Sequence, residues 1–185
     1  MVVGVDEVGR GSWAGPVCVA AVILGEKKID GLRDSKQLSS RERTELANLI
    51  KEHARYMRIG WASSIFVDKN GLTAAQRAAA FQALSDLWRV RDIEIILDGN
   101  HDYIGDRRVR TIIHGDQTEP AISAASIVAK VARDNFMAAI HNSFPAYGFN
   151  TNVGYGTKAH RLALAQYGAC QIHRQSYSPI QLLST

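Results

Sequence analysis

Two adjacent carboxylates near the start of the chain, Asp6 and Glu7, close a short apolar run and precede a Gly-Arg-Gly turn. Adjacent residues on a strand point to opposite faces, so at least one of these acids must face a cleft or solvent. Glycine lets the backbone approach a ligand closely, and Arg10 can offer a cation or a backbone N–H group to a phosphate. Carboxylates that bind metal ions beside a phosphate site are components of a metal-dependent nuclease, although an exposed acidic turn explains this octet equally well.

Two further acids follow the same pattern, because Asp98 ends the apolar run 93–97 and Asp116 follows the alternating run 108–114. Functional groups gather at strand ends in open sheets of strands and helices. Four carboxylates at one point would repel each other unless cations were present. Two divalent ions roughly 3.5–4 Å apart would relieve this and could hold both oxygens of a phosphoryl displacement. Alone, the segments around Asp98 and Asp116 are more often polar turns than sites, but together with Asp6 and Glu7 they favour a shared site.

The elements that must position these acids are predicted from hydrophobic periodicity. Five strands are expected, at residues 2–8, 17–24, 56–64, 93–97 and 108–114. The Gly-rich link between the first two favours an antiparallel pair. Ser39 and Glu42 form a capping box that opens a helix, and Pro120 suits the first turn of another. Further helices are expected from Thr73 and over residues 158–167, and Pro145 is expected to end the helix that begins at Pro120.

Apolar residues at helical spacing predict which face of each helix is buried. The buried face of the helix after Ser39 is expected to contain Leu46, Leu49, Ile50 and His53. The helix after Thr73 is expected to bury Ala74, Ala78, Phe81, Leu84 and Trp88. The helix after Pro120 is expected to bury Ala125, Ala129, Ala132, Phe136 and Ile140, and its small residues suit a close approach to a sheet. Three charged residues are expected to lie off that face: Lys130, Arg133 and Asp134.

Length and composition are those of an ordinary globular protein, with 185 residues, 46% hydrophobic and 22% charged. The length predicts one domain with a small appendage, and the order of elements along the chain places the boundary near residues 144–148, which gives a domain over residues 1–144 and a smaller region over 145–185. A net charge of +4 is compatible with a polyanionic partner but is weak evidence for one. Cys18 and Cys170 form no Cys-x-x-Cys pair, so a zinc site is not expected. We predict a cytoplasmic location, because no signal-peptide pattern and no membrane-spanning apolar run is present.

Basic and aromatic residues could position a nucleic-acid backbone. Three residues suit phosphate contacts, although each alone could be an ordinary solvated residue: Ser35, Lys36 and Lys130. Tyr155 stands between two glycines and could stack on a sugar or donate to a ribose 2′-OH, the group that distinguishes RNA from DNA. His160 and His173 could be catalytic, but structural roles are the more usual ones.

Motifs in a fixed order along nearly the whole chain resemble type 2 ribonuclease H, RNase HII. They are Asp-Glu-Val-Gly-Arg-Gly (6–11), Ala-Gly-Pro-Val (14–17), Asp-Ser-Lys-Gln-Leu-Ser (34–39), Asp-Gly-Asn (98–100), Gly-Asp (115–116), Ala-Ala-Ser-Ile-Val-Ala-Lys-Val-Ala-Arg-Asp (124–134), Gly-Tyr-Gly-Thr-x-x-His (154–160) and His-Arg-x-Ser-Tyr (173–177). The resemblance implies an α/β, RNase H-like fold, with a five-stranded mixed sheet flanked by helices. It also implies a small helical C-terminal region that packs on the catalytic domain and contributes to substrate binding.

The activity implied by this resemblance is hydrolysis of the RNA strand of RNA–DNA hybrids, and incision 5′ to single ribonucleotides in duplex DNA. The products would be 3′-hydroxyl and 5′-phosphate ends. Four acids would hold two Mg²⁺ or Mn²⁺ ions: Asp6, Glu7, Asp98 and Asp116. Three loop residues would contact the ribose 2′-OH and the scissile phosphate: Gly9, Arg10 and Gly11. Tyr155 would pack on the junction sugar, and Asp134 would pair with Lys130 within a helix.

One departure from the family pattern is Val153, where the family usually has a lysine, and a phosphate contact is expected to be lost there. Type 3 relatives usually carry an additional N-terminal domain and lack the Gly-Arg-Gly turn, so type 2 fits better. Two other functional classes stay open: a nucleic-acid-binding module without chemistry, and a DNase or resolvase of the same fold. We expect a monomer, and the tail 181–185 shows no docking motif for a replication clamp.

Overall fold

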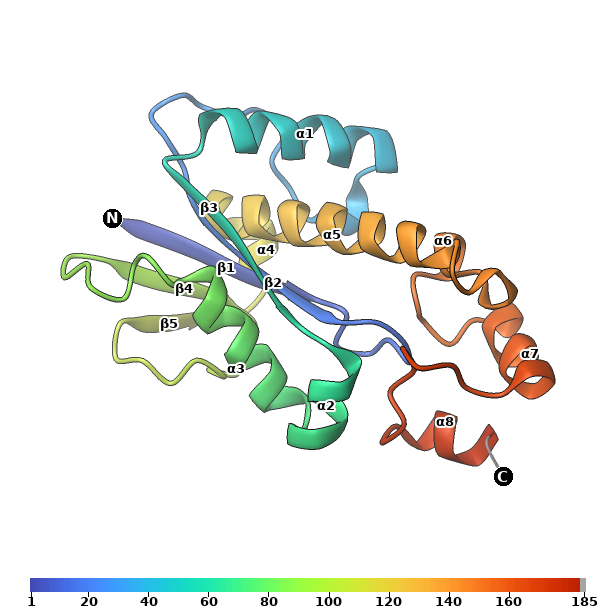
Figure 1. Cartoon of the computed structure of the whole chain (residues 1–185). Coiled ribbons are helices and arrows are strands. Elements are labelled where there is room, and N and C mark those ends of the chain that lie inside the picture. Colours follow the sequence, from blue (N-terminus) through green and yellow to red (C-terminus); the bar gives the residue numbers. More distant parts are fainter. Residues whose placement is uncertain (184–185) are drawn as a thin grey trace.

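The computed structural model describes residues 1–183 and contains a five-stranded sheet in the order β3-β2-β1-β4-β5 (Figure 1). The strands are β1 (Val2–Val8), β2 (Val17–Ile23), β3 (Tyr56–Ala62), β4 (Glu94–Asp98) and β5 (Val109–Ile112). β2 pairs antiparallel with both β1 and β3, whereas β1, β4 and β5 run parallel to one another. The sheet is therefore mixed, and all five predicted strands and the predicted antiparallel pair are confirmed.

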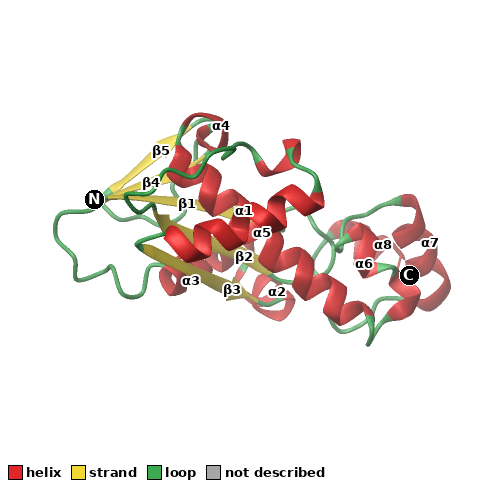
Figure 2. Ribbon diagram, turned by 90° about the horizontal axis from the view of Figure 1, so that it is seen from above, coloured by secondary structure: helices red, strands yellow, loops and turns green. Residues whose placement is uncertain are grey.

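Helices cover both faces of the sheet (Figures 1 and 2). They are α1 (Ser40–His53), α2 (Ser64–Asn70), α3 (Leu72–Ala83), α4 (Gly115–Thr118), α5 (Pro120–His141), α6 (Phe149–Asn152), α7 (Lys158–Tyr167) and α8 (Ser178–Leu183), with 3₁₀ turns η1 (Ser35–Gln37) and η2 (Pro145–Tyr147). α1 and α5 lie on one face, and α2 and α3 lie on the other. The Ser39–Glu42 capping box of α1 and Pro120 at the start of α5 are as predicted.

Two glycines of the sheet allow the helices to touch the strands directly. A Cβ added to Gly4 in β1 would lie 2.1 Å from the backbone carbon of Ala121 in α5. A Cβ added to Gly60 in β3 would lie 1.9 Å from the carbonyl oxygen of Ala79 in α3. No side chain fits in either position, so these crossings require glycine on the strand and small residues on the helix.

The predicted buried face of α3 is wrong by one position. The helix buries Ala75, Gln76, Ala79, Ala80 and Ala83, while Ala74 and Ala78 are half-buried and Phe81 is 43% exposed. The close approach to Gly60 leaves no room for an aromatic ring between helix and sheet. Phe81 instead packs against Trp88 outside the core, with ring centroids 4.5 Å apart and the rings tilted by 32°, and only Leu84 of the larger predicted residues is fully buried.

The predicted face of α5 is also partly wrong. Phe136 is 40% exposed and lies against Trp61, and the residues that are fully buried on this part of the helix are Arg133 and Met137. Arg133 is buried because backbone carbonyls surround its guanidinium, a compensation that periodicity does not reveal. On α1, Leu49 is 42% exposed, because this helix turns only Leu46 and Ile50 fully inward.

Several short elements were not predicted, namely α2, α6, α8 and the helical turn α4 that carries Asp116. α5 ends at His141, and Pro145 begins the turn η2 rather than ending the helix. Residues 145–183 contribute most of a third apolar cluster, which also includes Ala14 and Met137 from the preceding part of the chain. Within the described residues, no helix is both long enough and apolar enough to cross a bilayer.

Two buried histidines lie within that third cluster, in a hydrogen-bond chain that fixes their tautomers. The Cys170 N–H donates to His173 Nδ1 at 2.9 Å, so the proton of His173 is on Nε2. His173 Nε2 is 3.0 Å from His160 Nε2, and His160 Nδ1 is 2.9 Å from the carbonyl oxygen of Tyr155. Both rings are therefore satisfied in the neutral form, and burial lowers the pKa of His173 to about 4.

We expect this chain of hydrogen bonds to make the protein sensitive to acid. An unfolded histidine binds its proton near pH 6.5, whereas folded His173 resists protonation until about pH 4. The unfolded state therefore binds more protons in this window, and stability falls as pH decreases through it, by about 3 kcal/mol. Urea unfolding across the window measures this, and a His173→Gln variant should show a shallower pH dependence. An exposed His101→Gln variant serves as control, and equal slopes for the two variants would contradict the assignment.

Candidate active site

A hollow of about 380 Å³, here called the carboxylate pocket, opens where β1 and β4 end. Eight of its lining residues carry polar side chains: Asp6, Glu7, Ser35, Lys36, Asp98, Ser126, Lys130 and Tyr155. They come from β1, η1, β4, α5 and the loop before α7, segments that are distant in sequence. The structure thus brings together three of the four predicted acids and all the residues predicted for phosphate and sugar contacts outside the Gly-Arg-Gly turn.

The sheet register explains how the acids meet. β1 and β4 are parallel neighbours that pair Val5 with Leu97, so Asp6 and Asp98 occupy the next position on adjacent strands. Asp116 is held close by α4, where its backbone N–H donates to Asp98 Oδ1 at 3.2 Å. A Cβ on Gly115 would lie 2.5 Å from Ile122 Cδ1, so this tight turn requires glycine before Asp116. Asp116 was predicted at a strand end, but the structure places it in α4, four residues after β5 ends at Ile112.

Burial and mutual repulsion raise the pKa values of three of the four acids. Asp6 is only 8% exposed, and burial followed by repulsion from Glu7 and Asp98 raises its pKa well above the usual range. Burial likewise raises the pKa of Glu7, even though Tyr103 Oη donates to it at 3.0 Å. The pKa of Asp116 is raised by burial and then by Asp98. Additional positive charge at this position would relieve the repulsion, and oxygen donors of this kind suit hard divalent cations.

Two cations of the chain already contact these acids. Lys36 Nζ lies 3.3 Å from Asp116 Oδ2 and 3.6 Å from Asp34 Oδ1, and Arg10 Nη1 lies 3.6 Å from Glu7 Oε1. Within residues 1–183, no three acidic, histidine or cysteine side chains stand close enough to form a complete metal cage. The oxygen donors fit a hard divalent ion in their chemistry, and the side chains would have to draw together to hold one.

The predicted phosphate-contacting residues differ in how they are held. Ser35 is buried, with its hydroxyl 2.9 Å from that of Ser126. Lys130 Nζ donates to Asp134 Oδ1 at 2.8 Å, which confirms the predicted pairing within the helix. Tyr155 is 36% exposed, and its ring lies 5.8 Å from the guanidinium carbon of Arg133. The exposed part of the ring is therefore free to meet a ligand at the rim of the pocket.

The Gly-Arg-Gly turn has a conformation that its sequence makes possible. Gly9 has φ +93°, in the region that favours glycine, and a Cβ there would lie 2.4 Å from Arg133 Nε. Arg10 is exposed, and a Cβ added to Gly11 would meet no atom within 4 Å. The turn is thus tightly packed on its inner side and open on its outer side, next to Glu7.

Two fully buried arginines, which sequence reasoning did not identify as part of the site, support this turn from within. Arg174 donates from Nη2 to the Gly9 carbonyl oxygen at 2.6 Å and from Nη1 to that of Arg10 at 2.8 Å. Arg133 donates to the carbonyl oxygens of Pro16 at 2.9 Å, Ala14 at 3.1 Å and Val153 at 2.9 Å. The motif His-Arg-x-Ser-Tyr contained Arg174 but gave no indication that its side chain points inward.

This buried arginine pair, Arg133 and Arg174, determines which way the peptide groups of the turn point. In a trans peptide the carbonyl of one residue and the N–H of the next point in opposite directions. Since the carbonyls of Gly9 and Arg10 point inward to Arg174, the N–H groups of Arg10 and Gly11 point outward. Successive outward N–H groups form a concavity for anions, and the buried guanidiniums add positive potential beneath it.

Val153 also belongs to this region, as the residue that departs from the family pattern. It has φ +43°, a left-handed conformation that is strained for a β-branched side chain. Its carbonyl oxygen accepts from Arg133 Nη1, and the N–H of the following Gly154 is bound by Asn152 Oδ1 at 2.8 Å. These contacts hold Val153 in its strained conformation and fix the start of the loop that presents Tyr155.

The sheet order and the acids at its strand ends define an α/β protein of the ribonuclease H-like class. Solved structures share this fold. Ribonuclease HII of Archaeoglobus fulgidus, solved in complex with PCNA, matches with a TM-score of 0.80 at 24% identity, over 100% of this chain and 97% of that one. Bst-RNase HIII in complex with Mn²⁺ matches with a TM-score of 0.72 at 18% identity, over 98% of this chain and 68% of that one. The predicted fold class is confirmed.

The sequence comparisons identify the family. The family model for ribonuclease HII matches residues 3–180. Ribonuclease HII of Streptomyces avermitilis is 45% identical over 185 residues, which cover 99% of this chain and 79% of the relative. Ribonuclease HII of Hyphomonas neptunium is 45% identical over 199 residues, which cover 99% of this chain and 96% of the relative. The chain therefore belongs to the ribonuclease HII family, and it is a ribonuclease H that acts on RNA–DNA hybrids.

Proposed function

We propose that this ribonuclease H also incises duplex DNA on the 5′ side of a single embedded ribonucleotide, leaving 3′-hydroxyl and 5′-phosphate ends. The observation that carries the proposal is that Arg174 holds the carbonyls of Gly9 and Arg10, which turns the N–H groups of Arg10 and Gly11 outward in the turn that directly follows the pocket residues Glu7 and Val8. A ribose 2′-OH and its neighbouring phosphate could bind there while the scissile linkage faces the acids. A single ribose would then suffice for recognition.

Asp6, Glu7, Asp98 and Asp116 are proposed to hold two Mg²⁺ or Mn²⁺ ions. The support is the gathering of oxygen donors whose pKa values are raised by burial and mutual repulsion, together with the Mn²⁺ complex of Bst-RNase HIII. Two such ions, when bound, would activate a water molecule and stabilise the leaving 3′-oxygen. The chain itself would orient the phosphate through the Gly-Arg-Gly turn and contact it with Lys36 and Lys130 at the pocket wall.

The C-terminal region, residues 145–185, is proposed to contribute to substrate binding through Tyr155. Its support is the exposed ring at the rim of the pocket and the anchoring of this region to the turn by Arg174. Residues 184 and 185 lie outside the described part of the chain. Because every proposed site residue comes from one chain, we propose that a monomer is active.

A cleavage assay with matched duplexes tests the function. The purified chain is incubated with Mg²⁺ and a DNA duplex that carries one ribonucleotide, in parallel with an RNA–DNA hybrid and an all-DNA duplex. We expect cleavage of the first two only, with incision 5′ to the ribonucleotide. Cleavage of all three would indicate a DNase or resolvase, and binding of all three without cleavage would indicate a binding module. Cleavage of the hybrid alone would reject recognition of a single ribose.

We expect Tyr155→Ala to impair incision at single ribonucleotides about tenfold more than cleavage of long hybrids. A long hybrid offers many riboses and many registers, whereas a single ribonucleotide depends on one stacking contact, worth roughly 1–3 kcal/mol. The ratio of kcat/KM on the two substrates measures this. Tyr167→Ala, at an exposed tyrosine outside the carboxylate pocket, is the control and should leave the ratio unchanged. An equal loss on both substrates for Tyr155→Ala would remove Tyr155 from this role.

A further inference from the structure

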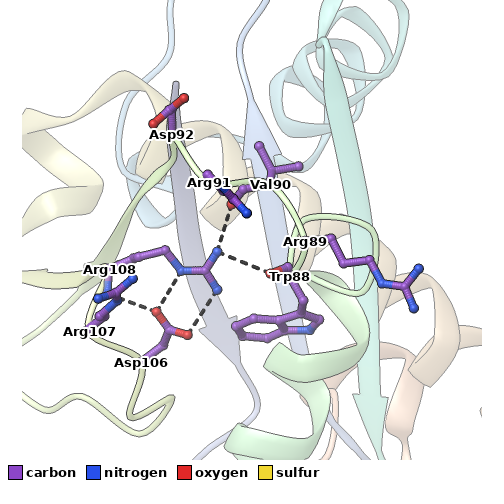
Figure 3. Close-up of a pocket in the computed structure, with 8 residues that line it drawn as sticks. All are labelled: Trp88, Arg89, Val90, Arg91, Asp92, Asp106, Arg107 and Arg108. Carbon is purple, nitrogen blue, oxygen red and sulfur yellow. Dashed lines mark hydrogen bonds and ion pairs between the residues drawn. The ribbon is translucent and has the colours of Figure 1, made fainter.

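A second polar hollow, here called the arginine pocket, has a volume of about 720 Å³ and lies away from the carboxylate pocket. It is formed by residues 88–92, which precede β4, and by residues 106–108, which precede β5 (Figure 3). β4 and β5 are parallel, so their first residues lie at the same end of the strands, whereas Asp98 is the last residue of β4 and lies at the opposite end. At about 3.3 Å per residue the two ends of β4 are separated by roughly 13 Å, so one phosphate group cannot reach both pockets.

Arg108 forms the fixed wall of this pocket. Its guanidinium donates from Nε to Asp106 Oδ1 at 2.8 Å and from Nη2 to Asp106 Oδ2 at 3.0 Å. It also donates to the carbonyl oxygen of Val90 at 3.0 Å, and so ties the two segments of the pocket together. The bidentate pair with Arg108 lowers the pKa of Asp106 to about 2. Both groups are thus charged and already satisfied by each other.

Three further arginines line the pocket without such partners: Arg89, Arg91 and Arg107. All three are exposed, and within residues 1–183 no hydrogen bond or ion pair holds their guanidinium groups. Four guanidiniums against the carboxylates of Asp92 and Asp106 leave two positive charges in the pocket. Figure 3 shows Arg107 and Arg89 on opposite sides, with Arg108 and Trp88 between them. The charge is therefore spread along the hollow rather than focused on one point.

The aromatic residue of the pocket is not available to a base. The guanidinium of Arg108 lies 5.5 Å from the ring centre of Trp88, and Phe81 lies 4.5 Å from it. Trp88 Nε1 also donates to the carbonyl oxygen of Phe81 at 3.2 Å. A ligand of this pocket would therefore meet guanidinium groups and no free ring. The absence of a free ring among the described residues that line the pocket excludes base stacking there and favours contacts with phosphates alone. Such phosphate contacts do not depend on the base sequence.

We propose that the arginine pocket binds the phosphate backbone of a nucleic acid, at a position separate from the linkage that is cleaved. Spread, unpaired guanidiniums match the spacing of successive phosphates along a strand better than they match one enclosed anion. The site would hold DNA or RNA without regard to sequence or sugar. It would keep the enzyme on a duplex between encounters with ribonucleotides, independently of the chemistry at the carboxylate pocket.

Binding of an all-DNA duplex without divalent ions tests the proposal, because no cleavage can occur. We compare Arg91→Gln/Arg107→Gln with Lys27→Gln/Lys51→Gln, which removes two exposed positive charges that lie outside the pocket and have no acidic partner within the described residues. Fluorescence anisotropy over a salt series gives the affinity and its salt dependence. We expect the arginine variant alone to bind about tenfold more weakly, with the slope of log K against log salt smaller by about 2.

Equal losses of affinity in the two double variants would mean that only the net charge of the protein matters. An unchanged affinity in the arginine variant would show that the pocket does not bind nucleic acid. Free phosphate is the other source of the same chemistry. It is tested by titrating inorganic phosphate at constant ionic strength and following arginine side-chain NMR signals. Phosphate binding that the arginine variant abolishes, with duplex binding intact, would overturn the proposal in favour of a small anion. Thermal melting of both variants checks that they are folded.

Discussion

Asp98→Asn is expected to reduce cleavage of both the RNA–DNA hybrid and the single-ribonucleotide duplex by about a thousandfold or more. Asp98 stands between the two acids of β1 and Asp116, and its Oδ1 accepts the N–H of Asp116. Asparagine has the same shape and keeps an oxygen for that N–H, so the fold should be preserved. What is lost is the negative charge, which the proposed metal ions require as a ligand. Single-turnover rates at saturating enzyme measure the loss.

The matched control is Asp30→Asn, which removes one exposed carboxylate that pairs with Lys28 and does not line the pocket. It should cleave as the unaltered chain does. Divalent-ion binding supplies a second readout, because Asp98→Asn should weaken the thermal stabilisation produced by Mn²⁺, whereas Asp30→Asn should not. A cleavage rate within tenfold of normal for Asp98→Asn would place the reaction elsewhere in the molecule.

Arg133→Met is expected to have the largest effect on stability, a loss of about 3–5 kcal/mol. The fully buried guanidinium of Arg133 donates to the carbonyl oxygens of Ala14, Pro16 and Val153 and to Ser12 Oγ at 2.7 Å. Methionine fills similar space but leaves these acceptors buried without donors. Because the same side chain touches the turn that presents Arg10, cleavage should fall as well. Urea unfolding measures the stability.

Arg133→Lys separates charge from geometry. Lysine keeps a positive charge but has one donor group in place of a planar fork, so it cannot reach all four acceptors. We expect it to recover less than half of the lost stability. Arg41→Met, which removes an exposed arginine paired with Glu45, is the control and should leave the stability nearly unchanged. Full recovery by lysine would show that charge alone is needed at residue 133.

The strands, the helix starts and the gathering of the acids could be predicted because each has a local signal. Apolar runs mark the strands, Ser39 with Glu42 marks a cap, and acids that follow strands mark a shared edge. Asp116 was assigned to the right place but the wrong element, because the turn α4 is too short for periodicity to reveal. The motif order supplied the family and the implied roles of the loop residues.

The inward arginines and the true helix faces could not be predicted, because both depend on tertiary contacts. Arg133 is buried only because carbonyls from two separate segments, residues 14–16 and Val153, converge on it, and neither segment is near it in sequence. Phe81 is excluded from the core because Gly60 brings α3 against the sheet. A prediction based on hydrophobicity places arginine at the surface and phenylalanine in the core. It is therefore wrong where nearby backbone groups determine which side chain is buried.

The anchoring of the Gly-Arg-Gly turn by Arg174 also has a consequence for protein synthesis. Arg174 lies 165 residues after Gly9, so the carbonyl groups of the turn gain this partner only when the ribosome has released the segment around residue 174. A nascent chain that ends near residue 145 already contains all four acids but has no Arg174 to orient the turn. Translation itself would therefore delay cleavage of nucleic acid until the segment around residue 174 has been made.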